Sequence, residues 1–112
     1  MAPSDEESNI QAIFSELKEG LAITLLAKAA EIWLNWDILK TEPDNLIIFE
    51  MLHRQAHTLS STCSIFEFES ISNFSSKIEL ALEQAQPRCL PYIEIEKLLE
   101  ELEAAAGSEP SE

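Results

Sequence analysis

The chain has two histidines, His53 and His57, which lie four residues apart. A neutral imidazole near pH 7 is a nucleophile, a proton carrier and a metal ligand. Two histidines at positions i and i+4 share one face of a helix and together could chelate a metal ion. No carboxylate completes a known metal motif around them, so Glu50 or Cys63 would have to join. We therefore expect no resident metal. Of the three functions that the sequence suggests, a metal-binding helical bundle has the least support.

The residues around His57 are unusually small. Ser60, Ser61 and Ser64 follow it at i+3, i+4 and i+7, and Arg54 precedes it by three residues. Serine in the middle of a helix has no capping role and is not favoured there. Short side chains leave an imidazole open to the surface of a partner, so we predict that Arg54 and these serines shape a docking face.

The apolar pattern around the histidines indicates which way each one points. Residues 49–66 place an apolar side chain at alternating intervals of three and four, as in the core positions of a helical bundle. In this register His57 lies about 130° from the centre of the apolar seam, at 100° per residue, and should face solvent. His53 lies beside the seam, where packing or a hydrogen bond at the bundle edge is expected. The core positions are Phe49, Leu52, Ala56, Leu59, Cys63 and Phe66.

Three further helices are predicted to position this one. With 2 Gly and 5 Pro in 112 residues, the chain has few turn formers and is predicted to be all-α. Apolar residues at helical spacing from Ile10 to Leu39 indicate a long helix that Gly20 kinks or divides. The expected breaks are a turn at 41–45 with Asp44 or Asn45 as N-cap, a turn at Glu69 and Ser70, and a loop at Pro87 and Pro91, after which a last helix starts near Tyr92.

Short connections between helices favour antiparallel neighbours. We therefore predict an antiparallel up-and-down four-helix bundle with an N-terminal helical extension. The bundle is expected to span residues 10–106. The acidic segments 1–9 and 107–112 are expected to be disordered tails.

The net charge excludes several function classes. The chain carries 7 Lys and Arg against 21 Asp and Glu, which gives −14. Nucleic acids and anionic membranes both require cationic contacts, so neither is an expected partner. The two cysteines, and the lack of a signal peptide or an apolar spanning segment, favour a cytoplasmic protein. Across residues 46–66 the charges of Glu50 and Arg54 cancel, which predicts a neutral window around His57.

The segment from Leu52 to Phe68, LHRQAHTLSSTCSIFEF, resembles the signature of histidine-containing phosphotransfer (HPt) domains. Downstream, Ile71, Phe74, Ile78 and Glu79 resemble the pattern of the third helix in that family. The resemblance implies that His57 is a phosphoacceptor that exchanges a phosphoryl group with the aspartate of a response-regulator receiver domain. It also implies a carrier with no catalytic residues and no cofactor of its own, partnered by a receiver domain, a hybrid histidine kinase or both. The Mg²⁺ is expected on the receiver.

The chain departs from the family pattern at three positions. Ser60 and Ser61 stand where the family often has Lys and Gly, and Glu67 stands where a second Gly is common. Arg54, one turn before His57, could partly replace the missing cation. These departures motivate the second function considered, a degenerate HPt-like adaptor that binds a receiver or kinase without phosphotransfer.

Overall fold

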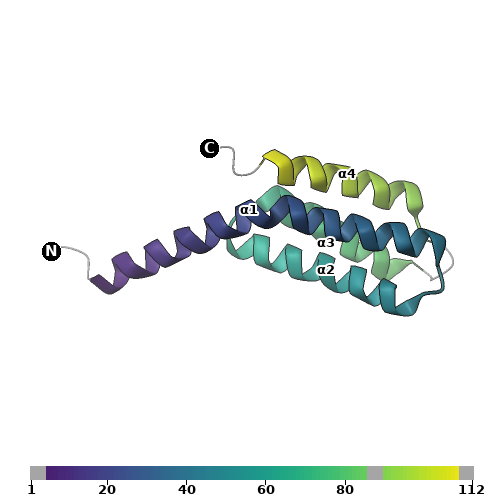
Figure 1. Cartoon of the computed structure of the whole chain (residues 1–112), viewed down its shortest axis with the longest axis horizontal. Coiled ribbons are helices and arrows are strands. Elements are labelled where there is room, and N and C mark those ends of the chain that lie inside the picture. The colour runs from purple at the N-terminus through teal and green to yellow at the C-terminus, as the bar shows by residue number, and fades with distance from the viewer. Residues whose placement is uncertain (1–4, 86–89, 109–112) are drawn as a thin grey trace.

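A computed structural model of the chain describes residues 5–85 and 90–108, with side chains from residue 9 onward. Within these ranges the protein consists of four α-helices and no strands: α1 (Asp5–Thr41), α2 (Leu46–Ile65), α3 (Glu69–Gln84) and α4 (Tyr92–Ser108). Each helix packs against the next one along the chain, and α1 also packs against α4. The helices run alternately in opposite directions (Figure 1). The predicted up-and-down four-helix bundle with its helical extension is confirmed.

The core consists mainly of aliphatic side chains from all four helices, and Trp36 is its largest fully buried side chain. Of the six core positions predicted in residues 49–66, Leu52, Ala56, Leu59 and Cys63 are buried, whereas the two Phe positions at the ends are partly buried against the core. The other fully buried large side chains are Leu25, Ile32 and Leu39 of α1, Ile71, Ile78 and Leu82 of α3, and Ile95, Leu99 and Leu102 of α4. Because each helix buries one stripe at three-and-four spacing, its other face is free to carry functional side chains.

Helix α1 is much longer than the others and extends beyond them (Figure 1). Its 37 residues correspond to roughly 55 Å at 1.5 Å per residue, which accounts for most of the 61 Å length of the molecule. Ile10, Ile13 and Leu17 continue the apolar stripe of α1 but are each more than half exposed. Phe14 is partly covered, because its ring lies 4.9 Å from that of Phe66 at the end of α2.

Several predicted boundaries were wrong. Residues 5–9, expected in a disordered tail, belong to α1, and residues 107–108, expected in the other tail, belong to α4. Helix α1 is not divided at Gly20, although it bends part-way along its length, as the alternative prediction of a kink allowed (Figure 1). Glu69 and Ser70, expected to form a turn, form the first turn of α3. The predictions for residues 1–4, 86–89 and 109–112 lie outside the described residues.

The two turns that flank α2 have identifiable caps. At its start the Oδ1 of Asn45 accepts a hydrogen bond of 3.2 Å from the backbone N–H of Ile48. Asn45 is therefore the N-cap, as one of the two alternatives predicted. At its end the N–H of Phe68 bonds to the carbonyl of Cys63 at 2.8 Å, and that of Glu67 to the carbonyl of Ser64 at 3.3 Å. This pair of bonds is a Schellman motif, in which the residue after the cap adopts a left-handed conformation.

Glu67 occupies that left-handed position, with φ of 65°. A residue with a Cβ is strained there by about 1–2 kcal/mol, whereas Gly is not. The structure thus gives a backbone reason for a glycine at this position. We expect Glu67→Gly to raise the free energy of unfolding by about 1 kcal/mol, measured by urea denaturation. Glu67→Ala, which removes the same charge but keeps the Cβ, is the control, and an equal gain from it would contradict the conformational explanation.

A cluster of polar side chains ties the C-terminal end of α1 to α4. Oε2 of Glu96 accepts hydrogen bonds from Nζ of Lys40 at 2.6 Å and from Nε1 of Trp36 at 3.0 Å. The hydrogen bond from Lys40, followed by that from Trp36, lowers the pKa of the Glu96 carboxyl below its usual range. A lowered carboxyl pKa stabilises the fold above the pKa of the unfolded chain, and this contribution is lost as the pH falls through the folded pKa.

This cluster makes the acid stability of the protein depend on Glu96. Between pH 7 and pH 3 we expect the wild type to lose more free energy of unfolding than Glu96→Gln, because the amide has no proton to gain. Urea denaturation at the two pH values measures the difference. The control is Glu94→Gln, a change at an exposed position of the same helix. If Glu96→Gln loses as much stability on acidification as the wild type, the explanation is wrong.

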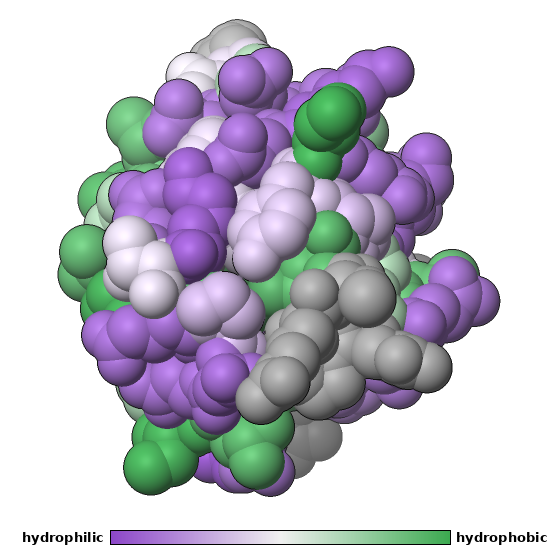
Figure 2. All heavy atoms as spheres, turned by 90° about the vertical axis from the view of Figure 1, so that its right-hand side faces the viewer, coloured by the Kyte–Doolittle hydropathy of each residue, from purple (hydrophilic) through white to green (hydrophobic). Residues whose placement is uncertain are grey.

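Within residues 5–85 and 90–108, no helix combines the length and apolar content needed to cross a membrane. Seen from the end that carries the α1–α2 connection, the surface is mostly hydrophilic with scattered hydrophobic groups (Figure 2).

Candidate functional site

The side chain of His57 projects from the outer face of α2, where 61% of it is exposed to solvent. The predicted exposure of this residue is therefore confirmed. One edge of the ring is anchored, because Nδ1 lies 2.7 Å from Oε2 of Glu79 on α3. The Glu79 side chain is only 17% exposed. A well-held carboxylate thus fixes the orientation of an otherwise exposed imidazole.

The contact with Glu79 determines which ring nitrogen of His57 is nucleophilic. An ionised carboxylate has only acceptor oxygens, so Nδ1 must carry the hydrogen of this bond. In the neutral ring the lone pair is then on Nε2. Within residues 5–85 and 90–108, Nε2 of His57 has no hydrogen-bond or ion-pair partner. The site therefore presents an unblocked nucleophilic nitrogen to the solvent.

The packing of α2 against α3 brings Glu79 to His57. Ile78 and Leu82 of α3 are fully buried, so Glu79 lies at the edge of the buried stripe and faces α2. Near the connection between the helices, Oγ of Ser72 donates a hydrogen bond of 2.9 Å to the carbonyl of Ser60, which helps to set their register. The sequence motif included Glu79 but did not show its role, because the partner of His57 is 22 residues away along the chain.

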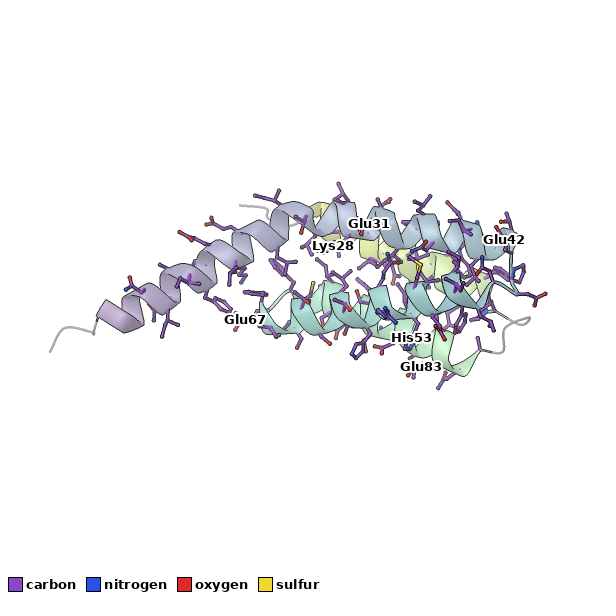
Figure 3. All side chains as sticks on the ribbon, turned by 60° about the horizontal axis from the view of Figure 1, so that its bottom comes forward. Lys28, Glu31, Glu42, His53, Glu67 and Glu83 are labelled. Atoms are coloured by element: carbon purple, nitrogen blue, oxygen red, sulfur yellow. The ribbon has the colours of Figure 1, made fainter. Side chains whose placement is uncertain are left out.

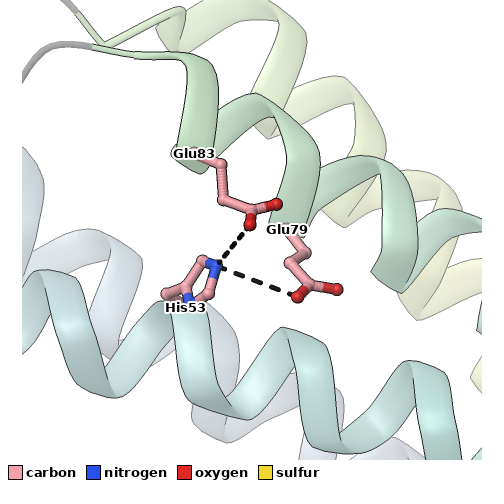
Figure 4. Close-up of side chains that lie close together, drawn as sticks. All are labelled: His53, Glu79 and Glu83. Atoms are coloured by element: carbon pink, nitrogen blue, oxygen red, sulfur yellow. Dashed lines mark ion pairs between the residues drawn. The ribbon is translucent and has the colours of Figure 1, made fainter.

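His53 lies one turn before His57 and faces two carboxylates of α3 (Figures 3 and 4). Its Nε2 is 3.6 Å from Oε1 of Glu83 and 3.8 Å from Oε2 of Glu79. The side chain is 32% exposed, as expected beside the seam. Of the packing or hydrogen bond predicted for His53 at the bundle edge, the hydrogen bond is not formed at Nε2, which is shielded from solvent and has only the two ion-pair contacts in the described structure.

Arg54 is exposed and lies between two grooves. One groove contains both histidines together with Glu79 and Glu83. The other runs between α1 and α2 and contains Lys28 and Glu31, which are both labelled on α1 in Figure 3. Within the described part of the chain Arg54 makes no ion pair, so its guanidinium is available to an incoming anion.

The three serines downstream of His57 do not share one environment. Ser61 and Ser64 are exposed and lie one and two turns after His57. Their short side chains project little from the surface of α2. Ser60 is half-buried and lies where α2 approaches α3, through its carbonyl bond to Ser72. The structure therefore places Ser61 and Ser64, rather than Ser60, on the accessible face.

The predicted neutral window around His57 was wrong. The charges of Glu50 and Arg54 cancel along α2, but Glu79 and Glu83 of α3 line the same groove as His57. Counting charges along one helix missed them, because the neighbouring helix contributes half of the groove. The surroundings of His57 are consequently acidic on the α3 side, whereas the groove on the α1 side carries both Lys28 and Glu31 and shares Arg54 with the first groove.

The metal site considered from the sequence does not form as described there. In the described ranges the side chains that converge as possible ligands are His53, Glu79 and Glu83, and neither Glu50 nor Cys63 belongs to this group. Cys63 lies in the core, where burial raises its pKa to about 11. A buried thiol with a raised pKa is unreactive near neutral pH. Cys89 lies outside the described residues.

The structure is that of an antiparallel four-helix bundle whose second helix presents an exposed imidazole, held by a carboxylate of the third helix. The family model for the Hpt domain matches residues 9–106. The chain therefore belongs to the Hpt domain family, whose members are phosphotransfer modules of phosphorelays. Comparison with curated proteins and with solved structures gives no match.

Proposed function

We propose that this protein carries a phosphoryl group on His57, which it exchanges with the aspartate of a receiver domain. The observation that supports the proposal best is the geometry of the ring: Nδ1 is held by Glu79 at 2.7 Å, and the exposed Nε2 is free. Membership of the Hpt domain family supports the same chemistry.

The transfer follows from this geometry with all atoms balanced. The Nε2 lone pair attacks the phosphorus of an aspartyl phosphate, a P–N bond forms, and the bond from phosphorus to the aspartate oxygen breaks. The aspartate leaves as a carboxylate. The ring keeps its Nδ1 hydrogen and becomes positively charged, and Glu79 stabilises that charge. The reverse step returns the phosphoryl group.

Other residues of the proposed site bind and position, and none is proposed to be catalytic. The unpaired Arg54 supplies a cation near the phosphoryl group, in place of the lysine that the family often has. Ser61 and Ser64 leave room for the receiver surface to approach. The receiver supplies Mg²⁺ and most of the charge stabilisation, because positioning and electrostatics dominate phosphoryl transfer.

The proposal is tested by mixing the purified protein with a phosphorylated receiver domain and Mg²⁺. We expect label on this chain that is labile in acid and stable in alkali, which distinguishes a P–N bond on histidine from an acyl phosphate. If candidate receivers bind the protein but never transfer label to it, the phosphotransfer proposal fails.

The alternative proposal is an adaptor that binds a receiver or kinase without accepting a phosphoryl group. The acidic groove favours it, because Glu79 and Glu83 repel an incoming phosphoryl group and Ser60 replaces a family lysine. The same experiment separates the two proposals, since the adaptor forms a complex that His57→Gln leaves intact and never acquires label.

A further inference from the structure

Three side chains that can bind a metal converge beside His57. His53 comes from α2, and Glu79 and Glu83 come from adjacent turns of α3 (Figure 4). One potential ligand atom from each residue lies within 4.8 Å of the other two. Two rigid helices hold the three groups, so little ordering is required to bring them together.

Hydrogen bonding does not account for this arrangement. Nε2 of His53 is 3.6 and 3.8 Å from the nearest oxygens of Glu83 and Glu79, beyond the usual N–H···O range of 2.7–3.2 Å. This nitrogen is also shielded from solvent and has no hydrogen-bond partner in the described structure, so the two carboxylates are its only polar contacts there. Metal–ligand bonds of 2.0–2.2 Å in a tetrahedron separate the ligand atoms by about 3.4 Å, which is close to both distances.

We propose that His53, Glu79 and Glu83 bind one divalent transition-metal ion, of which Zn²⁺ is the representative. An imidazole with two carboxylates suits Zn²⁺, and the two negative charges balance the ion. Mg²⁺ prefers six oxygen ligands and retains its water, so it fits the buried nitrogen poorly. Three protein ligands leave a fourth position open to water.

The same site couples to His57 through Glu79, an inference that rests on the proposed function. Oε2 of Glu79 accepts the hydrogen bond from Nδ1 of His57 and also faces His53. A bound cation withdraws electron density from the Glu79 carboxylate. This weakens the hydrogen bond that the carboxylate accepts from Nδ1 of His57. Metal loading thus slows phosphoryl transfer at a nitrogen that the metal does not touch.

Zn²⁺ titration with a competing chromophoric chelator tests the site directly. We expect one Zn²⁺ per wild-type chain, and affinities lower by roughly tenfold or more for His53→Gln and Glu83→Gln. Glu50→Gln is the matched control, because Glu50 lines the same groove but is not one of the three ligands. Glu50→Gln and His57→Gln should both bind Zn²⁺ at least as tightly as the wild type. Circular dichroism verifies that each variant is folded. Because Glu83 is exposed, Glu83→Gln should perturb the fold less than His53→Gln.

Each contrary result overturns the site. If the wild type binds no Zn²⁺, the three groups form only an ion pair. If His53→Gln and Glu83→Gln bind Zn²⁺ with wild-type affinity, the three residues are not its ligands. If Glu50→Gln lowers the affinity equally, Zn²⁺ binds nonspecifically to surface carboxylates. Excess Mg²⁺ should not displace Zn²⁺, and displacement at equal concentration contradicts the ligand assignment.

The coupling is measured separately, as the rate at which label from a phosphorylated receiver reaches His57. Zn²⁺ should slow the wild type by roughly tenfold, as expected from loss of a charged hydrogen bond, and leave Glu83→Gln unaffected. Equal slowing of both proteins places the effect on the receiver and refutes the coupling. Failure of phosphotransfer without metal refutes the proposed function and leaves the Zn²⁺ titration valid.

Discussion

Replacing His57 by glutamine should abolish phosphoryl acceptance completely. Glutamine keeps a polar side chain of similar size but has no lone pair on nitrogen that can form a stable P–N bond. Because 61% of the His57 side chain is exposed, the fold should be unchanged. The measurement is acid-labile label on the chain after incubation with a phosphorylated receiver and Mg²⁺, together with circular dichroism.

The control is His53→Gln in the absence of transition metals. His53 is the other histidine of the same helix, and its Nε2 is shielded from solvent, so a receiver cannot reach that atom as it reaches His57. This variant should accept label as the wild type does. Label that persists in His57→Gln, or that disappears in His53→Gln, would place the phosphoryl group on a different residue.

Removing the charge of Glu79 should slow transfer by roughly tenfold to hundredfold. A hydrogen bond to a charged group contributes about 1.5–3 kcal/mol, and each 1.36 kcal/mol corresponds to a tenfold change in rate. Glu79→Gln no longer stabilises the positive ring that forms as the P–N bond is made. It also no longer favours the tautomer that carries hydrogen on Nδ1, so fewer molecules present a free Nε2.

Two measurements separate this positioning role from a structural one. Two-bond ¹H–¹⁵N spectra of the His57 ring should show hydrogen on Nδ1 in the wild type and a shift toward the other tautomer in Glu79→Gln. Glu83→Gln is the control, because Glu83 is one turn away on α3 and forms its ion pair with His53 instead of His57. If the transfer rate falls while the tautomer stays the same, Glu79 acts through the fold.

The sequence was sufficient to predict the architecture and the exposure of His57. The stripe from Leu52 to Cys63 is periodic over several turns, and a periodic stripe determines both the buried face and the opposite one. The position of a solvent-facing residue on such a helix follows from counting at 100° per residue. The bundle, the start of α4 and the outward direction of His57 all follow from this local regularity.

The features that sequence reasoning missed depend on where neighbouring helices come together. The Glu79 carboxylate meets His57 only because α2 and α3 pack with a particular register, which no periodicity within α2 reveals. Likewise the sequence showed only that Glu67 stands where the family commonly has Gly, whereas its left-handed backbone conformation is the feature that favours glycine there. The true start of α3 depends on the same turn, since the chain bonds Phe68 back to Cys63 before the helix begins.

Charge is distributed unequally on the two sides of His57, so this face of the protein is electrostatically asymmetric. The carboxylates of Glu79 and Glu83 lie on the α3 side, whereas on the α1 side Lys28 offsets Glu31 and the cation of Arg54 lies between the two grooves. Such a separation is an electric dipole lying within the docking face, and it exerts a torque on any charged surface that approaches. At physiological salt the torque acts over about 8 Å. A partner with an acidic pocket is therefore rotated toward the α1 side before contact, and added salt removes this alignment without altering the imidazole.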